Sequence, residues 1–220
     1  MAYSAQARTN MITNQLEPSG VVSQGLLEAI AKVPRELFVP KEFQEASYLD
    51  DDIPLGHGNR YLIEPRVFAR LLQAAEVIQR HRVLDIACGT GYSSAILAEL
   101  TEHIVAIESA GELAEVARRN LHELKASVEL FNASLIGGYS LKAPYDLIFI
   151  NGAVSFIPDE LIEQLSEGGR IVGVLCENPH AGIGQAIRWT KMGERLHPEI
   201  LFDATIPLLT EFEQKRNFEF

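Results

Sequence analysis

The feature that most constrains the fold is a repeated change in apolar spacing between positions 82 and 175. Short apolar runs, typical of buried strands, alternate with segments in which apolar residues recur every three or four positions. The strand-like runs are RVLDIA, HIVAIE, ASVELF, APYDLIFING and GGRIVGVL, and the helical segments are SSAILAEL, ELAEVARRNLHEL and PDELIEQL. Such alternation is typical of βαβ units, so the sequence predicts a doubly wound, mostly parallel α/β sheet.

The flanking segments extend this core within one expected domain, residues 1–220. Residues 21–33 place apolar side chains on one helical face, and Pro34 should end that helix. Residues 41–65 read as loop and short extended structure, and Pro65 should open the next helix. Residues 66–177 form the predicted cofactor-binding core, which follows an amino-terminal helical extension with an acceptor-side loop, residues 1–65. Residues 178–220 contain IRWTKMG and PEILFDATIPLL, which we interpret as antiparallel strands at the sheet edge.

Composition excludes several classes of function. A formal charge of -11 disfavours a nucleic-acid partner, because phosphate binding needs clustered lysine and arginine. The start, MAYSAQARTNMITNQ, lacks the apolar core of a signal peptide, and the apolar runs are shorter than the roughly 20 residues that span a bilayer. We therefore expect a cytoplasmic protein without membrane partners. Cys88 and Cys176 lack metal-ligand spacing, so no metal site is predicted and both should be small buried residues.

The strongest local signal is VLDIACGTGYSSAILA, residues 83–98, in which a strand ends in Asp85 and a turn of small residues leads into a helix. The turn contains Ala87, Gly89 and Gly91, and glycine lets the backbone approach a ligand closely. The next strand, HIVAIE, ends in Glu108. An acid there can accept hydrogen bonds from the two hydroxyls of a ribose, while an acid at the first turn can face a cationic amino group.

Two cofactor classes use this architecture. A nicotinamide dinucleotide favours a third small residue at position 94 and an uncharged strand end before the glycines, whereas this chain has Ser94 and Asp85. No Gly-Lys-Ser/Thr phosphate loop occurs. S-adenosylmethionine carries an ammonium, a sulfonium and no phosphate, so the pattern favours that cofactor. The alternatives are that Asp85 or Glu108 is only a capping or surface acid, or that the fold has lost its ligand.

Beyond the glycine turn, four segments resemble one known family, the protein-L-isoaspartate O-methyltransferases. They are residues 10–40 with the specific string VPRELFVP, residues 48–58 (YLDDDIPLGHG), APYDLIFINGAV, and IPDELIEQLSEGGRIV. IPLLTEFEQ near the end is also similar to the family's cofactor-closing tail. The resemblance covers most of the chain. It implies a Rossmann-like class I methyltransferase that uses S-adenosylmethionine to methylate carboxyl groups of isoaspartyl peptides or proteins in protein repair.

The resemblance also implies roles for individual residues. Four of them should hold the cofactor directly: Asp85, Gly89, Gly91 and Glu108. The remaining residues assigned to the cofactor side are Ala87, Ser109, Asn132, Ala133, Ser134 and Asn151. Asn132 to Ser134 should flank the adenine, and Asn151 is either an acceptor-side residue or a strand-end turn former.

Two departures from the family pattern bear on the substrate. The family has Gly-Asp-Gly after the third strand, where this chain has Asn132-Ala133-Ser134, so a carboxylate near the adenine amine is missing. The family's acceptor-orienting segment, Gly-Gln-Thr-Ile-Ser-Gln-Pro, is replaced by GNRYLIEP, one residue longer. Leu62 and Ile63 occupy the hydroxyl positions and cannot donate a hydrogen bond. Three hypotheses follow: an isoaspartyl methyltransferase, a methyltransferase with another acceptor, or a non-catalytic cofactor-binding protein.

Methylation of a carboxylate needs no general base, because a carboxyl group with a pKa near 4 is already ionised at neutral pH. The site must instead orient and desolvate the acceptor. In the segment Asn59-Arg60-Tyr61-Leu62-Ile63-Glu64, Arg60 is the best candidate for a bidentate carboxylate clamp, with His57 and the position of Ile63 as weaker candidates. The alternative for Arg60 is a surface ion pair with Glu64 or with Asp50 to Asp52.

Overall fold

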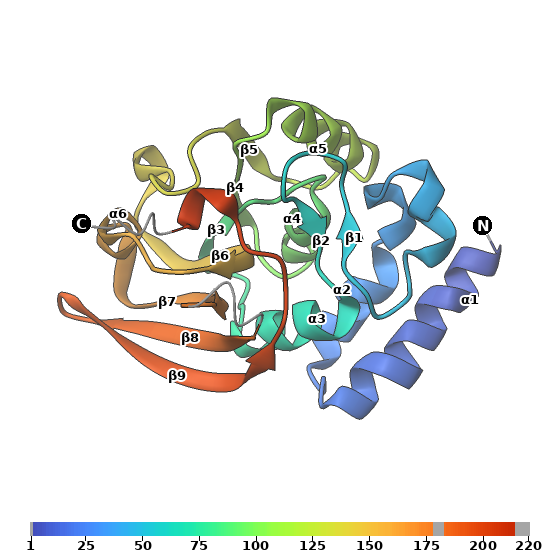
Figure 1. The fold of residues 1–220 in the computed structure, drawn as a ribbon, viewed down its shortest axis with the longest axis horizontal. Helices are drawn as coiled ribbons and strands as arrows, with labels where there is room; N and C mark the ends of the chain where they lie inside the picture. Colours follow the sequence, from blue (N-terminus) through green and yellow to red (C-terminus); the bar gives the residue numbers. More distant parts are fainter. Residues whose placement is uncertain (1, 178–182, 214–220) are drawn as a thin grey trace, which may run out of the picture.

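The computed structural model describes residues 2–177 and 183–213, and their main feature is a seven-stranded sheet in the order β5-β4-β3-β6-β7-β8-β9. Neighbouring strands from β5 to β7 are parallel, whereas β8 and β9 are antiparallel to their neighbours. The strands are β3 (Arg82–Ile86), β4 (His103–Glu108), β5 (Glu129–Asn132), β6 (Tyr145–Val154), β7 (Leu165–Leu175), β8 (Gly184–Met192) and β9 (Arg195–Ala204). The predicted fold class, with its antiparallel carboxyl-terminal edge, is confirmed (Figure 1).

The sheet changes its direction of growth at β3. From β3 the chain adds β4 and β5 on one side and then returns to add β6 and β7 on the other side. The central strand β3 is buried on both faces, as shown by Val83, Leu84 and Ile86, which are 0% exposed. In such sheets ligands bind beyond the carboxyl ends of the strands where the order reverses. The topology therefore places a candidate site beside the end of β3.

The helices form where the apolar spacing predicts them. They are α2 (Gln24–Lys32), α3 (Pro65–Ala74), α4 (Tyr92–Ala98), α5 (Gly111–Glu123) and α6 (Asp159–Glu163). Helix α3 begins at Pro65, whose fixed φ suits the first helical position, and it buries Val67, Phe68 and Leu71. Helix α2 ends at Lys32, two residues before Pro34, because the residue before a proline is disfavoured in the helical conformation.

A helical amino-terminal extension was predicted, but its first helix, α1 (Ala2–Met11), was not located from the sequence. It continues as a π-helix, η1 (Ile12–Leu16), and lies at the opposite end of the molecule from the β8–β9 hairpin (Figure 1). Its sequence has few apolar residues at helical spacing, and its anchors are Met11 and the following Leu16, both almost fully buried. Two anchors are too few to give a clear helical period, so tertiary packing explains this helix better than amphipathicity does.

Residues 47–64 form loop and short extended structure, as expected, but the prediction was wrong for Lys41–Ala46, which form a 3₁₀ helix. After two 3₁₀ helices, η3 (Arg35–Phe38) and η4 (Lys41–Ala46), β1 (Ile53–Pro54) pairs with β2 (Tyr61–Leu62) in a small antiparallel hairpin. We call residues 53–62 the cover hairpin. Leu55 N–H donates to the Arg60 carbonyl at 2.9 Å, so these two residues are fixed relative to each other within the hairpin.

Beyond β9 the chain returns across the carboxyl ends of the strands. This segment, residues 205–212, is here called the strap; it includes the 3₁₀ turn η7 (Thr210–Phe212) and is red in Figure 1. Ala153 on β6 donates to the Pro207 carbonyl and accepts from Leu209 N–H, both at 2.9 Å. The parts of the prediction for residues 178–220 that fall on 178–182 and 214–220 lie outside the described residues.

The two cysteines are small buried residues, as predicted. Cys88 lies in the glycine turn and Cys176 follows β7, and both carry free thiols. Within the described residues, no helix combines the length and apolarity that crossing a bilayer requires.

Candidate functional site

The two predicted acids lie at the ends of adjacent parallel strands and are fully buried. Asp85 is on β3, whose last paired residue, Ile86, lies opposite Ile107, directly before Glu108 on β4. The intervening turn folds onto the second acid, because Gly89 N–H donates to Glu108 Oε2 at 3.0 Å. We call residues 83–91 and 103–110 the floor of the site.

Glycine is required at two positions of this turn. Gly89 has a φ of +57°, and a Cβ atom there would lie 2.7 Å from Cδ1 of Leu55 in the cover hairpin. Gly91 has a φ of +97° and forms the N-cap of α4. Ala87 adopts a φ of +57° without being glycine, a conformation that is uncommon for a residue with a side chain and clusters at functional sites. The turn is therefore built for close approach to its backbone.

Asp85 is held by three side-chain donors. Its Oδ2 accepts hydrogen bonds from Ser93 at 2.7 Å and Ser94 at 2.5 Å, and its Oδ1 accepts one from Asn151 Nδ2 at 2.7 Å. Burial raises the pKa of the Asp85 carboxyl to about 6, and the three hydrogen bonds limit that rise. The serine that distinguishes position 94 from a dinucleotide-binding turn is thus a direct partner of Asp85.

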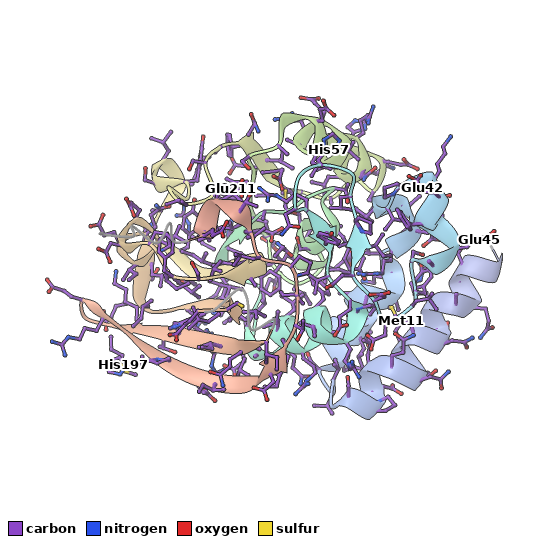
Figure 2. All side chains as sticks on the ribbon, viewed as in Figure 1. Met11, Glu42, Glu45, His57, His197 and Glu211 are labelled. Carbon is purple, nitrogen blue, oxygen red and sulfur yellow. The ribbon has the colours of Figure 1, made fainter. Side chains whose placement is uncertain are left out.

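Glu108 is bound by the floor and by the cover hairpin. Its Oε1 accepts from Ala110 N–H at 3.0 Å and from Arg60 Nε at 3.1 Å. Arg60 Nη2 also donates to Ser109 Oγ at 2.8 Å and to Glu211 Oε1, on the strap, at 2.5 Å. Figure 2 shows Glu211 where the strap ends. Arg60 therefore joins the cover hairpin, the floor and the strap through one buried guanidinium.

The charges in this cluster stabilise one another. Burial by itself lowers the pKa of Arg60, but the hydrogen bond with Glu211 and the charges of Glu108 and Glu211 raise it above its ordinary value. Burial raises the pKa of Glu211, yet hydrogen bonds from Arg60 and Ser109 hold it at about 2. The Arg60–Glu211 ion pair is therefore fully charged at neutral pH. The alternative that Arg60 pairs at the surface with Glu64 or with Asp50 to Asp52 is wrong, because Arg60 is buried and its acidic partners are Glu108 and Glu211.

The other residues proposed for catalysis do not converge on the glycine turn. His57 Nε2 lies 3.1 Å from Glu112 at the tip of the cover hairpin (Figure 2). Leu62 and Ile63 are 8% and 3% exposed and belong to the apolar core. The Ile63 carbonyl accepts from the buried Arg35 at 2.6 Å, which fixes the base of the hairpin. The aliphatic character of Leu62 and Ile63 is thus explained by packing, and the catalytic roles of His57 and Ile63 remain predictions.

The three residues after β5 lie beside the end of β4. Asn132 Nδ2 donates to the carbonyls of Glu108 and Ser109 at 2.7 and 3.0 Å, and Ala133 N–H donates to the Glu108 carbonyl at 3.2 Å. Ser134 is exposed. Asn132 thus braces the strand end that carries the second acid, and contact of these residues with an adenine stays a prediction.

Sequence reasoning missed three residues of this site: Leu55, Ser93 and Glu211. Leu55 and Ser93 lie inside predicted segments, but nothing in their spacing indicates their contacts. Glu211 lies 151 positions from Arg60, and its sole signal was the tail IPLLTEFEQ. Contacts across such separations depend on the path of the strap, which the sequence pattern does not give.

The chemistry of the floor fits S-adenosylmethionine better than a dinucleotide. Two buried carboxylates flank the turn, so a pyrophosphate placed there would meet negative charge, whereas an ammonium and a sulfonium would be stabilised. Glu108 lies on one side of the turn, and Asp85 with Asn151 lies on the other side; contact of Glu108 with a ribose stays a prediction.

Comparison with known proteins decides the family. The family model described as protein-L-isoaspartate(D-aspartate) O-methyltransferase (PCMT) matches residues 6–188. This chain belongs to that family. Membership in the PCMT family confirms the resemblance predicted from the motifs, together with its enzyme class, a carboxyl O-methyltransferase that depends on S-adenosylmethionine.

Individual relatives agree with this assignment. A protein-L-isoaspartate O-methyltransferase of Aeropyrum pernix is 39% identical over 215 residues, covering 94% of this chain and 80% of the relative. One from Methanoculleus marisnigri is 36% identical over 166 residues, covering 75% of each chain.

Solved structures share the fold of the PCMT family member described here. One protein-L-isoaspartate O-methyltransferase superposes with a TM-score of 0.81 at 24% identity; the match covers 92% of this chain and 65% of that protein. A putative protein-L-isoaspartate O-methyltransferase from Plasmodium falciparum, in complex with S-adenosyl-L-homocysteine, has a TM-score of 0.76 at 16% identity, covering 94% of this chain and 98% of that one.

Proposed function

We propose that this chain transfers the methyl group of S-adenosylmethionine to the carboxylate of an isoaspartyl residue in a peptide or protein. The observation that carries the proposal is the family match over residues 6–188, which includes both buried strand-end acids and the glycine turn between them. This function places the cofactor on the floor and the acceptor over residues 56–64.

The residues of the floor have distinct tasks in this reaction. S-adenosylmethionine supplies an electrophilic methyl group, whose bond to sulfur breaks as a bond to an acceptor oxygen forms. Glu108 accepts from the ribose hydroxyls, and the charge of Asp85 favours the cofactor's ammonium group. Ser93, Ser94 and Asn151 hold Asp85 in place. No residue needs to remove a proton, because the acceptor carboxylate is already ionised.

The acceptor class can be tested directly. The purified protein is incubated with methyl-labelled S-adenosylmethionine and an isoaspartyl peptide, with the same peptide carrying ordinary aspartate as the matched control. We expect a base-labile methyl ester on the isoaspartyl peptide only. Absence of ester from a protein that binds S-adenosylhomocysteine in calorimetry would contradict the proposal.

A second acceptor class has one specific observation in its favour. Leu62 and Ile63, at the positions of the family's hydroxyl residues, are buried in the core and offer no donor to a carboxylate. A methyltransferase of the same fold with a different acceptor would give label on small carboxylates or phenols in the same assay and none on the isoaspartyl peptide.

We also propose that the protein works in the cytoplasm and does not bind nucleic acid. Two free, buried thiols suit a reducing compartment, and a formal charge of -11 disfavours phosphate backbones. Fractionation of cells, with the protein detected by antibody, tests the location: recovery in a membrane or secreted fraction would contradict it.

A further inference from the structure

The carboxylate proposed to bind ribose is already almost saturated. A carboxylate offers about four lone-pair positions. Three positions on Glu108 accept hydrogen bonds from Ala110 N–H, Gly89 N–H and Arg60 Nε, and the side chain is 0% exposed. Two ribose hydroxyls need two acceptor positions, so Glu108 cannot receive both in this arrangement. The two backbone donors belong to the floor, which leaves Arg60 as the donor that must move.

The cover hairpin also blocks the glycine turn. Cδ1 of Leu55 lies only 2.7 Å from the position that a Cβ of Gly89 would take, and Leu55 N–H donates to the backbone carbonyl of Arg60. A ligand that approaches the backbone of Gly89 must therefore displace Leu55. Because the hairpin fixes Leu55 and Arg60 relative to each other, one outward movement of the hairpin takes Arg60 away from Glu108 and Leu55 away from Gly89.

The strap holds the hairpin in this position. Arg60 is 5% exposed and donates to both carboxylate oxygens of Glu211, at 2.5 and 3.3 Å. Asn59 Nδ2 donates to the Leu208 carbonyl at 2.5 Å. Both partners lie on the strap, so the hairpin cannot lift without breaking these bonds or moving the strap with it.

We propose that Arg60 and Glu211 form a latch that closes the ribose position at Glu108, and that binding of the cofactor opens this latch and releases the strap. The inference rests on the proposed function, because it assumes that an adenosine compound binds at Glu108. Arg60 is then a residue that sets cofactor affinity, since its ion pairs compete with the ribose hydroxyls. The acceptor clamp predicted from the sequence would require the same release.

The first test compares the affinity of S-adenosylhomocysteine for the wild type and for Arg60→Gln by titration calorimetry. Removing the competing guanidinium should raise the affinity about tenfold, which corresponds to ~1.4 kcal/mol. The matched control is Arg66→Gln, an exposed arginine that pairs with Asp50 and Glu64, for which we expect an unchanged affinity. An equal or lower affinity in Arg60→Gln would overturn the latch.

The second test needs no variant and covers the case in which Arg60→Gln folds poorly. Hydrogen exchange of the strap amides, such as Leu209 and Phe212, is followed in the wild type with and without S-adenosylhomocysteine. The latch predicts faster exchange in the strap when the ligand binds. Slower or unchanged exchange would show that the strap closes on the ligand or ignores it, and would overturn the proposal.

The outcomes separate this inference from the proposed function. Binding by the wild type without the predicted changes defeats the latch and leaves the cofactor assignment intact. Binding by Arg60→Gln alone supports the latch in its strongest form. If neither protein binds S-adenosylhomocysteine, the cofactor assignment is wrong and the latch falls with it.

Discussion

The floor and its cover are built in different ways, although they touch. In the floor, several partners of the acids lie close in the sequence, since Asp85 binds Ser93 and Ser94 and Glu108 binds Ala110; the third partner of Asp85, Asn151, is 66 positions away. In the cover, Asn59 and Arg60 bind partners on the strap that lie 149 and 151 positions away. A site with a locally determined floor and a distantly assembled cover can keep its binding groups fixed while access to them changes.

The largest expected effect breaks the floor itself. Asp85→Ala removes a buried charge and leaves the donors of Ser93, Ser94 and Asn151 without their acceptor. We expect the affinity for S-adenosylhomocysteine to fall roughly 1,000-fold, or about 4 kcal/mol. Calorimetry measures this loss, and Asp203→Ala, at an exposed position on β9, is the control. Unchanged affinity in Asp85→Ala would show that the cofactor binds elsewhere.

A second substitution at the same residue separates charge from hydrogen bonding. The pKa of Asp85 is about 6 when folded and 3.8 in its ordinary state, so the folded protein binds more protons between these values and its stability falls as pH rises through them. Asp85→Asn removes this dependence. The unfolding free energy of Asp85→Asn minus that of the wild type should therefore increase as the pH rises from 4 to above 6, by about 3 kcal/mol in total. Denaturant unfolding at several pH values measures it; a constant difference would contradict the raised pKa.

Stability of the strap should depend on one apolar anchor. Leu209 is 1% exposed and fills the space above Gly152, where an added Cβ would clash at 2.6 Å. Leu209→Ala should cost about 2 kcal/mol in the opening of the strap, read as faster hydrogen exchange there with the floor unchanged. Ile200→Ala, at an exposed position, is the control. Equal loss of protection in floor and strap would show that the two regions open together.

The smallest effect is expected where the floor meets solvent. Asn132→Ala removes hydrogen bonds to the carbonyls of Glu108 and Ser109, at a side chain that is exposed. Water can replace these donors, so the unfolding free energy should fall by only about 1 kcal/mol. A loss several times larger in chemical denaturation would mean that Asn132 fixes the end of β4 more firmly than its exposure suggests.

The same contrast explains what the sequence could predict. The period changes predicted the strands and helices of the sheet, and the strand-end acids with their glycine turn predicted the floor, because both patterns are local. Arg60 was singled out for its donors, but its partner on the strap was not found. Helix α1 was also missed, because Met11 and Leu16 form no helical period in the sequence and are recognised as anchors only from their burial in the structure. Interactions between segments that are distant in the sequence produce no periodic pattern of apolar residues, so they cannot be predicted in this way.

The most direct test is a crystal structure of this chain with S-adenosylhomocysteine. The account predicts that the ribose hydroxyls donate to Glu108 and that Arg60 Nε has moved beyond hydrogen-bond distance from its present 3.1 Å contact with Oε1. An adenosine bound elsewhere, or a ribose on Glu108 with Arg60 still in place, would contradict it.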